Sequence, residues 1–313
     1  MNKKIGAAIV GIMVFQWSSV YWLGPDNLGM ARGYTSLSML KPYVYRQLPS
    51  ILARLLVSLG VRIDLAIVLL MTGAGIGFYL ALRELAFSLY RKDEKAELLL
   101  VVLVGVGLVF FGDYRMPYDI FTAWLFTLAF LYIGQGDKTS LAILFPLACL
   151  NRETAFLLII LSAIVGILKN DKDGTEGTLL YQTSAFVLIQ VLLRTLFYNN
   201  GGVDALIEPL ENIQRFIARP WITLLHGFVT FGLLKIALQN WTWKPMFLRA
   251  ALIALLPRMT VMYIVFGQAF EVRVFGEVYP ILALLMLPTL HSLKIWRPNV
   301  QLVSIRKTSE GKE

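Results

Sequence analysis

Five charged residues lie where the surrounding sequence is otherwise apolar. They are Arg152, Glu153, Glu271, Arg273 and Glu277. An ionised side chain in membrane hydrocarbon costs at least ~2.5 kcal/mol, so such residues usually pair with one another, face a wet cavity or contact a ligand. Arginine is always charged and offers a planar fork of donors that suits phosphate. We therefore predict a phosphate-binding site that contains these five residues, in which the glutamates orient the arginines. The alternative is a set of ion pairs that only holds helices together.

A short polar segment between two apolar runs adds carboxylates and another arginine. Asp113, Arg115 and Asp119 lie in this segment. A carboxylate can deprotonate an attacking hydroxyl and contribute about 10² to 10⁴-fold to a rate. Asp113 and Asp119, together with Asp26 earlier in the chain, are the outer carboxylates that could do this, and their assignment as catalytic residues is what the family resemblance described below implies. Arg46 and Arg115 complete the predicted phosphate contacts. Asp119 has an alternative role as a polar cap, because the helix dipole favours an acidic residue in the first turn.

The composition is that of a protein embedded in a bilayer. Hydrophobic residues make up 57% of the 313 residues and charged residues 16%. Apolar runs near the ~20 residues that cross a hydrocarbon core recur along the chain. We expect one transmembrane domain over residues 1–313 and no separate soluble domain. The net charge of +9 is explained by positive loops beside the spans, so no nucleic-acid partner is expected.

The apolar runs predict an all-α membrane helix bundle of about ten spans. The outer loops fall at about 24–62, 112–118, 199–220 and 267–278. The spans fall at roughly 5–23, 63–83, 97–111, 119–134, 140–150, 155–168, 179–198, 221–238, 246–266 and 279–295. Gly73 and Gly77 form a G-x-x-x-G in the second of these, which indicates close helix packing because no strand or helix start accompanies it.

The lysines decide how the chain threads the membrane. The segment Asn151 to Thr154 interrupts the apolar run 139–169, which is either one long helix or a tight hairpin of two short ones. With a hairpin, twelve of the thirteen lysines lie on the side of the termini and only Lys41 lies outside, as the positive-inside bias favours. We therefore predict a short re-entrant-like hairpin, cytoplasmic termini and a location in an inner (plasma) membrane. Eleven of the sixteen arginines then lie outside, with ten carboxylates.

Two interfacial helices are predicted on the outer side. Pro49 is placed to open an amphipathic helix through Leu59, and the periodicity after Pro209 predicts a second one.

Charges on the inner side have a simpler interpretation. We interpret Arg83, Lys169 and their neighbours as topogenic charge attracted to an anionic leaflet. Asp171 and Asp173 form a D-x-D, which we interpret as a coincidence in a short turn. The single cysteine, Cys149, allows neither a disulfide framework nor a thiolate metal site.

Three segments and the overall layout resemble the GT-C class of membrane glycosyltransferases, which includes protein O-mannosyltransferases and aminoarabinose transferases. The layout has a first outer loop with an early aspartate and a surface helix, a short acidic second outer loop and about ten spans. The segments look like patterns in small bacterial membrane proteins related to that class. They are Tyr45-Arg46-Gln47-Leu48-Pro49, Asn151-Arg152-Glu153-Thr154 and Glu271-Val272-Arg273-Val274-Phe275-Gly276-Glu277.

The resemblance implies transfer of a sugar from a polyprenyl-phosphate donor to an acceptor at the outer face. Asp26 matches the first-loop general base, although that class often has two acids there and Asp26 is followed by Asn27. Asp113 or Asp119 matches the second-loop acid. Arginines would stabilise the departing lipid phosphate. No cofactor is expected, although carboxylates could bind a divalent metal, and the expected partners are membrane lipid and the polyprenyl-phosphate donor.

Two other classes of function fit the same residues. A lipid or small-molecule transporter, or flippase, would use the same polar cavity but thread charge through to the inner side. A non-catalytic assembly factor would use the outer pairs only to hold helices together. Convergence of the charged residues on one site favours the enzyme, and dispersal over separate helix contacts favours the assembly factor.

Overall fold

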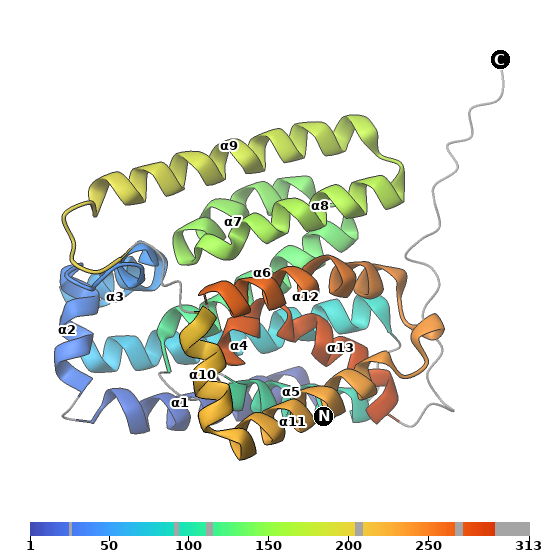
Figure 1. The fold of residues 1–313 in the computed structure, drawn as a ribbon, viewed down its shortest axis with the longest axis horizontal. Coiled ribbons are helices and arrows are strands. Elements are labelled where there is room, and N and C mark those ends of the chain that lie inside the picture. Colours follow the sequence, from blue (N-terminus) through green and yellow to red (C-terminus); the bar gives the residue numbers. More distant parts are fainter. Residues whose placement is uncertain (25–26, 91–93, 111–114, 204–208, 267–271, 292–313) are drawn as a thin grey trace.

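The computed structural model describes residues 1–24, 27–90, 94–110, 115–203, 209–266 and 272–291. Within these ranges the chain is mainly helical, as predicted, and most helices run side by side (Figure 1). The helices are α1 (Lys3–Trp22), α2 (Leu28–Ser36), α3 (Gln47–Ser58), α4 (Ile63–Leu89), α5 (Glu94–Phe110), α6 (Pro117–Gln135), α7 (Lys138–Asn151), α8 (Phe156–Lys169), α9 (Lys172–Leu196), α10 (Pro209–Ala218), α11 (Pro220–Leu238), α12 (Met246–Phe266) and α13 (Tyr279–Leu290).

Six of these helices are long and apolar enough to cross a membrane. They are α1, α4, α6, α9 from Gly174 onward, α11 and α12. The four other predicted spans correspond to α5, α7, α8 and α13, which have 17, 14, 14 and 12 residues. A helix of 14 residues is about 21 Å long, short of the ~30 Å core. The helices therefore indicate an integral membrane protein, whereas the predicted count of ten spans is not confirmed.

Small residues let the neighbours of α4 approach it closely. A Cβ on Gly75 would lie 2.6 Å from a methyl carbon of Val14 in α1, and one on Gly77 would lie 2.6 Å from the Trp124 ring in α6. The packing role predicted for Gly77 is thus confirmed. A Cβ on Gly73 would meet no described atom within 4 Å, so the second glycine of the motif carries the contact.

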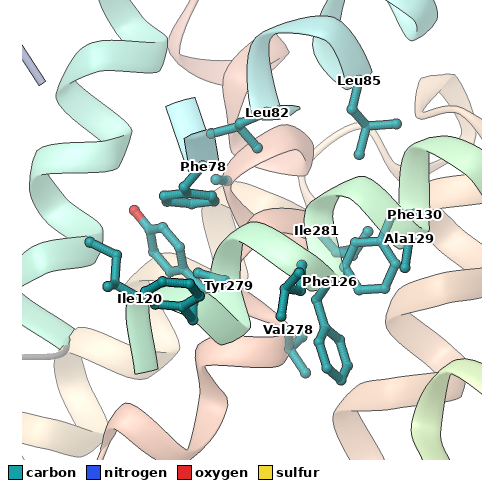
Figure 2. Packing of buried hydrophobic residues seen from close by; sticks show 14 of the residues in the cluster. Phe78, Leu82, Leu85, Ile120, Phe126, Ala129, Phe130, Val278, Tyr279 and Ile281 are labelled. Atoms are coloured by element: carbon teal, nitrogen blue, oxygen red, sulfur yellow. The ribbon is translucent and has the colours of Figure 1, made fainter. Parts of the chain in front are cut away.

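The main apolar core centres on α4 and α6 and also includes side chains of α1, α5, α7, α8, α12 and α13. Figure 2 shows Tyr279 of α13 close to Phe78 of α4 and Ile120 of α6, with Phe126 and Phe130 of α6 further along the same core. All five side chains are buried. Burial of each large side chain contributes roughly 1.5–3 kcal/mol in an aqueous reference. This layer fixes the first turn of α6 relative to the segment before α13, and both of these carry candidate site residues.

The interruption at residues 151–154 is a hairpin, as predicted. The helix α7 ends at Asn151, Arg152 is extended with φ −160° and ψ 141°, and a 3-10 turn (Glu153–Ala155) leads into α8. At the other end of the hairpin, Lys169 donates from Nζ to the carbonyls of residues 133 and 134 near the end of α6, at 3.2 and 2.9 Å. The two arms therefore return to the end of the bundle from which α7 started.

The chain passes repeatedly between two ends of the bundle. At the amino-terminal end, Met1 N lies 3.8 Å from Glu94, and Lys3 Nζ lies 3.6 Å from Glu84 at the end of α4. The opposite end holds the start of α6 and the turn of the α7–α8 hairpin (Figure 1). We call this opposite end the cluster end, because Asp119 contacts Arg152 and Arg273 there.

Both predicted surface helices are present. The helix α3 begins two residues before Pro49, and α10 begins at Pro209. Each leaves apolar side chains exposed, among them Ile51 and Leu55 on α3 and Leu210 on α10. A helix with one exposed apolar face is typical of a lipid interface.

Candidate functional site

Six charged residues from four separate segments meet at the cluster end. We call them the charge cluster: Arg46, Asp119, Arg152, Glu153, Arg273 and Glu277. All except Glu153 are at most 8% exposed, and the Glu153 side chain is 32% exposed. They come from the start of α3, the first turn of α6, the α7–α8 hairpin and the 3-10 segment Val272–Glu277. Every one of these residues was predicted from the sequence, and the structure brings them together.

Asp119 lies between two arginines. Its Oδ1 is 3.3 Å from Arg152 Nη1, and its Oδ2 is 3.1 Å from Arg273 Nη1. Pro117 opens α6 and places Asp119 in the first turn, where the helix dipole favours a carboxylate. The cap role considered from the sequence thus coexists with a charge-pairing role. Because both oxygens are engaged by guanidinium groups, Asp119 is better suited to position arginines than to accept a proton.

Tyr118 lies among the three arginines. The guanidinium carbon of Arg46 is 4.3 Å from the centroid of its ring, and those of Arg152 and Arg273 are each 6.0 Å away. Arg273 also donates from Nη1 to the Tyr118 hydroxyl at 3.0 Å. A ring face attracts cations, so Tyr118 offsets part of the repulsion between the arginines. Tyr118 was not among the predicted site residues, and its position next to Asp119 was the only signal for it.

The two glutamates of the cluster have opposite electrostatic environments. Burial disfavours the charged form of Glu153, but Arg46, whose Nη2 is 3.0 Å from Oε1, outweighs this and lowers the pKa of Glu153 to about 2. Burial raises the pKa of Glu277, and Arg152 at 3.3 Å together with the Thr154 hydroxyl at 2.6 Å offsets that only in part. Arg46 therefore holds Glu153 as an anion, whereas burial favours the protonated form of Glu277.

Neutral side chains from the hairpin hold the cluster in shape. Asn151 donates from Nδ2 to the Tyr118 carbonyl at 3.1 Å and to the Thr122 hydroxyl at 2.8 Å. This ties the end of α7 to the first turns of α6. The extended backbone at Arg152 then ends α7, so that the two arms of the hairpin separate at the cluster. Asn151 and Thr154 flank Arg152 and Glu153 in the motif noted in the sequence, but that motif gave no indication of their individual roles.

Four polar atoms of the cluster are buried without a hydrogen-bond partner in the part of the chain that the structure describes. They are Nε of Arg46, Nε of Arg152, Oε2 of Glu153 and Oε2 of Glu277. A buried polar atom that lacks a partner costs about 1–3 kcal/mol, and more for a charged group. These two N–H donors and two carboxylate acceptors could therefore form hydrogen bonds with a polar ligand.

The remaining predicted residues lie elsewhere or outside the described residues. Arg115 contacts α1, because it donates from Nη1 to the Trp17 carbonyl at 2.6 Å and lies over the Trp17 and Tyr21 rings. Asp26, Asp113 and Glu271 lie outside the described residues, so their catalytic or orienting roles stay predictions. Among the described residues, no group of three histidine, cysteine or carboxylate side chains could hold a metal ion.

A second group of charged residues lies near the amino-terminal end. Arg83 of α4 was interpreted from the sequence as topogenic surface charge, but it is only 6% exposed. Its Nε donates to Glu97 of α5 at 2.6 Å, and Tyr79 donates to the same carboxylate at 2.8 Å. Glu84 accepts from Arg83 Nη1 at 2.9 Å. That interpretation was wrong, because an arginine nearly two turns inside the end of α4 can still reach the acidic first turn of α5.

The apolar helices indicate that this protein belongs to the class of helical integral membrane proteins, and the charge cluster lies at one end of its bundle. Comparison with known proteins finds no matching family model, no similar curated protein and no similar solved structure.

Proposed function

We propose that this protein is a membrane glycosyltransferase of the GT-C type, which moves a sugar from a polyprenyl-phosphate donor to an acceptor at the outer face of the membrane. The observation that carries the proposal is the meeting of three arginines and three carboxylates from four distant segments, with arginine Nε atoms left over. Dispersed helix contacts would have argued against it. In this proposal the chain makes ten passes, the cluster end faces outward and both termini are cytoplasmic.

The arginines supply the leaving-group contacts. Arg46 and Arg152 each have an unpartnered Nε among the described residues, so each can donate to a phosphate oxygen without breaking its existing ion pair. Charge-assisted bonds of this kind strengthen as negative charge develops on the departing phosphate. Three guanidinium groups oppose three carboxylates, and a proton on Glu277 leaves one excess positive charge at the site. The raised pKa of Glu277 favours that state.

The carboxylates have separate roles in the proposal. Asp119 and Glu153 orient the arginines, because each is held by at least one guanidinium group. Asp26 is the proposed general base, with Asp113 as the second candidate, and the acceptor hydroxyl transfers its proton to that carboxylate as it attacks the anomeric carbon. The bond from the anomeric carbon to the phosphate oxygen breaks, and the polyprenyl phosphate leaves with the bonding electrons.

Binding of the lipid product tests the phosphate contacts. Native mass spectrometry of the full chain in detergent would compare a polyprenyl phosphate with the matching polyprenol. We expect the phosphate to bind at least tenfold more tightly, and Arg152→Gln to remove most of this preference, since one charge-assisted bond of about 1.4 kcal/mol is worth tenfold. Arg54→Gln is the matched control, because Arg54 is exposed on α3. Equal binding of the alcohol, or equal loss in both variants, would contradict the proposal.

The reaction itself needs a separate assay. Release of polyprenyl phosphate from a panel of polyprenyl-phosphate sugars would be measured in nanodiscs. We expect wild-type release with at least one donor and none from Asp26→Asn protein that folds and inserts normally. Retained release in Asp26→Asn would transfer the base role to Asp113.

A non-catalytic assembly role has one specific observation in its favour. Each charge in the cluster lies near an opposite charge, as Arg46 does with Glu153 at 3.0 Å. The double swap Arg46→Glu with Glu153→Arg separates the two functions. If the pair only joins helices, the swap restores the stability that either single change removes, and the cells behave as wild type. In the glycosyltransferase proposal the swap restores stability but not phosphate binding.

A further inference from the structure

A separate polar site lies between α7, α8 and α9, at the amino-terminal end of the bundle. Two cavities there have Lys138, Leu141 and Thr178 in common in their walls, so they adjoin. The first lies between the turns 136–138 and 169–171. The second has a volume of about 350 Å³ and continues between α7 and α9, at the small end of the range for ligand sites.

The first cavity combines two cations with two helix N-termini. Lys138 and Lys169 both line it. Asp137 and Asp171 also line it, and they are the N-caps of α7 and α9, where each accepts a backbone N–H three residues further on at 3.0 and 3.2 Å. Helix N-termini and lysines both favour phosphate. The two aspartates are already engaged as caps, and Asp171 also accepts from Lys138 at 2.8 Å. A ligand in the first cavity would therefore meet mainly hydrogen-bond donors, among them the remaining N–H groups of the two lysines.

Two buried polar side chains in the cavity walls point to a ligand. Ser162 lines the first cavity and is 7% exposed, and its hydroxyl has no partner among the described residues. Gln182 lines the second cavity and is fully buried, and both its amide nitrogen and its amide oxygen lack partners there. Leaving such buried groups unsatisfied is destabilising, and a bound polar group would remove that cost.

The surroundings of the second cavity are those of a lipid rather than of a soluble anion. Its wall combines the apolar side chains of Leu141, Ala142 and Tyr181 with the polar side chains of Lys138, Thr139, Thr178 and Gln182. Ile143 of α7 and Leu180 of α9, beside this wall in the sequence, are 71% and 72% exposed. An acyl chain leaving the cavity would therefore continue along apolar side chains. A polar cavity beside exposed apolar side chains matches the order of groups in a phospholipid.

We propose that these cavities form a phospholipid site, in which the lipid phosphate lies between Lys138 and Lys169 and the glycerol ester group faces Gln182. The site takes an anionic phospholipid, because Asp171 is already paired with Lys138 and Asp137 already accepts from Ser140 in the first turn of α7, whereas an ammonium headgroup would need an uncommitted carboxylate. It lies at the opposite end of the bundle from the charge cluster and does not depend on the proposed glycosyltransferase function.

The test uses the full chain in detergent and three probes, which are an intact anionic phospholipid and two fragments of it. Native mass spectrometry would measure binding of phosphatidylglycerol, of diacylglycerol with the same acyl chains and of soluble glycerol 3-phosphate. We expect phosphatidylglycerol to bind at least tenfold more tightly than either fragment. Lys138→Gln should weaken its binding by about tenfold, the loss expected for one charge-assisted bond. Its ion pair with Asp171 is half exposed, so the fold should persist.

Two further variants complete the test. Lys95→Gln is the matched control, since Lys95 is exposed at the start of α5 near the same end of the bundle, and it should bind phosphatidylglycerol like the wild type. Gln182→Leu should weaken phosphatidylglycerol binding but leave the weak binding of glycerol 3-phosphate unchanged. Equal binding by the Lys138 and Lys95 variants would overturn the proposal. Glycerol 3-phosphate that binds as tightly as the lipid would also overturn it, in favour of a soluble phosphate ligand.

Discussion

Two groups of buried charged residues lie near opposite ends of the same bundle, and they are built differently. The group around Arg83 joins α4 to α5, which are consecutive in the chain, through Glu97 and Tyr79. In the part of the chain that the structure describes, no buried side-chain nitrogen or oxygen of these three residues lacks a partner. The charge cluster instead joins four distant segments and leaves polar atoms unpartnered, among them Nε of Arg46 and Nε of Arg152.

This difference separates a structural ion pair from a candidate ligand site. A buried charge is tolerated when its donors and acceptors are satisfied, and the Arg83 group meets that condition by itself. The charge cluster meets it only in part, although it contains more charges and more helices. The excess hydrogen-bonding capacity, rather than the burial of charge, is what indicates a ligand.

The largest effect that this comparison predicts is on stability at Glu97. Glu97→Ala leaves Arg83 buried without its main partner, and we expect the free energy of unfolding to fall by about 3–5 kcal/mol. Unfolding in mixed micelles, followed by circular dichroism, would measure it. The double variant Arg83→Leu with Glu97→Leu should recover most of the loss, because apolar residues of similar size replace the pair. If the double variant is as unstable as Glu97→Ala, Arg83 and Glu97 do more than satisfy each other's charge.

Much of the charge cluster could be predicted from the sequence, because charged residues in apolar surroundings have few explanations. Arg152, Glu153, Arg273 and Glu277 were identified in this way, and the α7–α8 hairpin followed from the distribution of lysines. The contrast with Arg83 shows the limit of the same reasoning. Arg83 is near a helix end, where a lysine or arginine usually reaches water. Nothing in the local sequence reveals that α5 packs against α4 so that Glu97 contacts Arg83.

The pairing within the cluster could not be predicted, since it depends on tertiary contacts between residues that are 33 to 154 positions apart in the chain. Tyr118 is an example: it lies between Pro117 and Asp119 in the sequence, which gives no sign that three guanidinium groups converge on its ring. The number of membrane passes also remained beyond the sequence. Several apolar runs form helices of 12 to 17 residues, and whether such a helix crosses the bilayer depends on its neighbours and on local membrane thickness.

The next largest effect concerns Asn151, which holds the hairpin against α6. Asn151→Ala removes two hydrogen bonds and leaves the Tyr118 carbonyl without this donor, so we expect a loss of about 1–3 kcal/mol in the free energy of unfolding. Binding of polyprenyl phosphate should fall further than this loss of stability alone would cause, because Arg152 follows Asn151 directly. Titration at a temperature where the variant is fully folded would separate the two effects. Unchanged binding would show that the arginines bind phosphate without the hydrogen bonds from Asn151 to α6.

A smaller effect is predicted for the pH dependence of the cluster. Because the pKa of Glu277 is raised above its ordinary value of 4.5, its proton is bound more tightly in the folded protein than in the unfolded chain. The stabilisation is complete below pH 4.5 and is lost as the pH rises through the raised pKa. Phosphate binding should weaken over the same range, and Glu277→Gln should make binding independent of pH there. Glu153, with a pKa of about 2, stays ionised throughout and serves as the control position. A Glu277→Gln protein whose binding still declines with pH would assign the proton to another group.

The smallest effect is predicted for Arg115, which tests where the cluster ends. Arg115 was a candidate phosphate ligand from its sequence position, yet its side chain contacts the Trp17 carbonyl and the rings of Trp17 and Tyr21 on α1. Arg115→Gln should lower the free energy of unfolding by about 0.5–1.5 kcal/mol, the range for one hydrogen bond and a partly exposed cation–π contact. Binding of polyprenyl phosphate should change less than twofold, because Arg46, Arg152 and Arg273 keep their arrangement around Tyr118. A loss of binding as large as that of Arg152→Gln would instead extend the site to the end of α1, where the aromatic residues around Arg115 would become part of the lipid-binding surface.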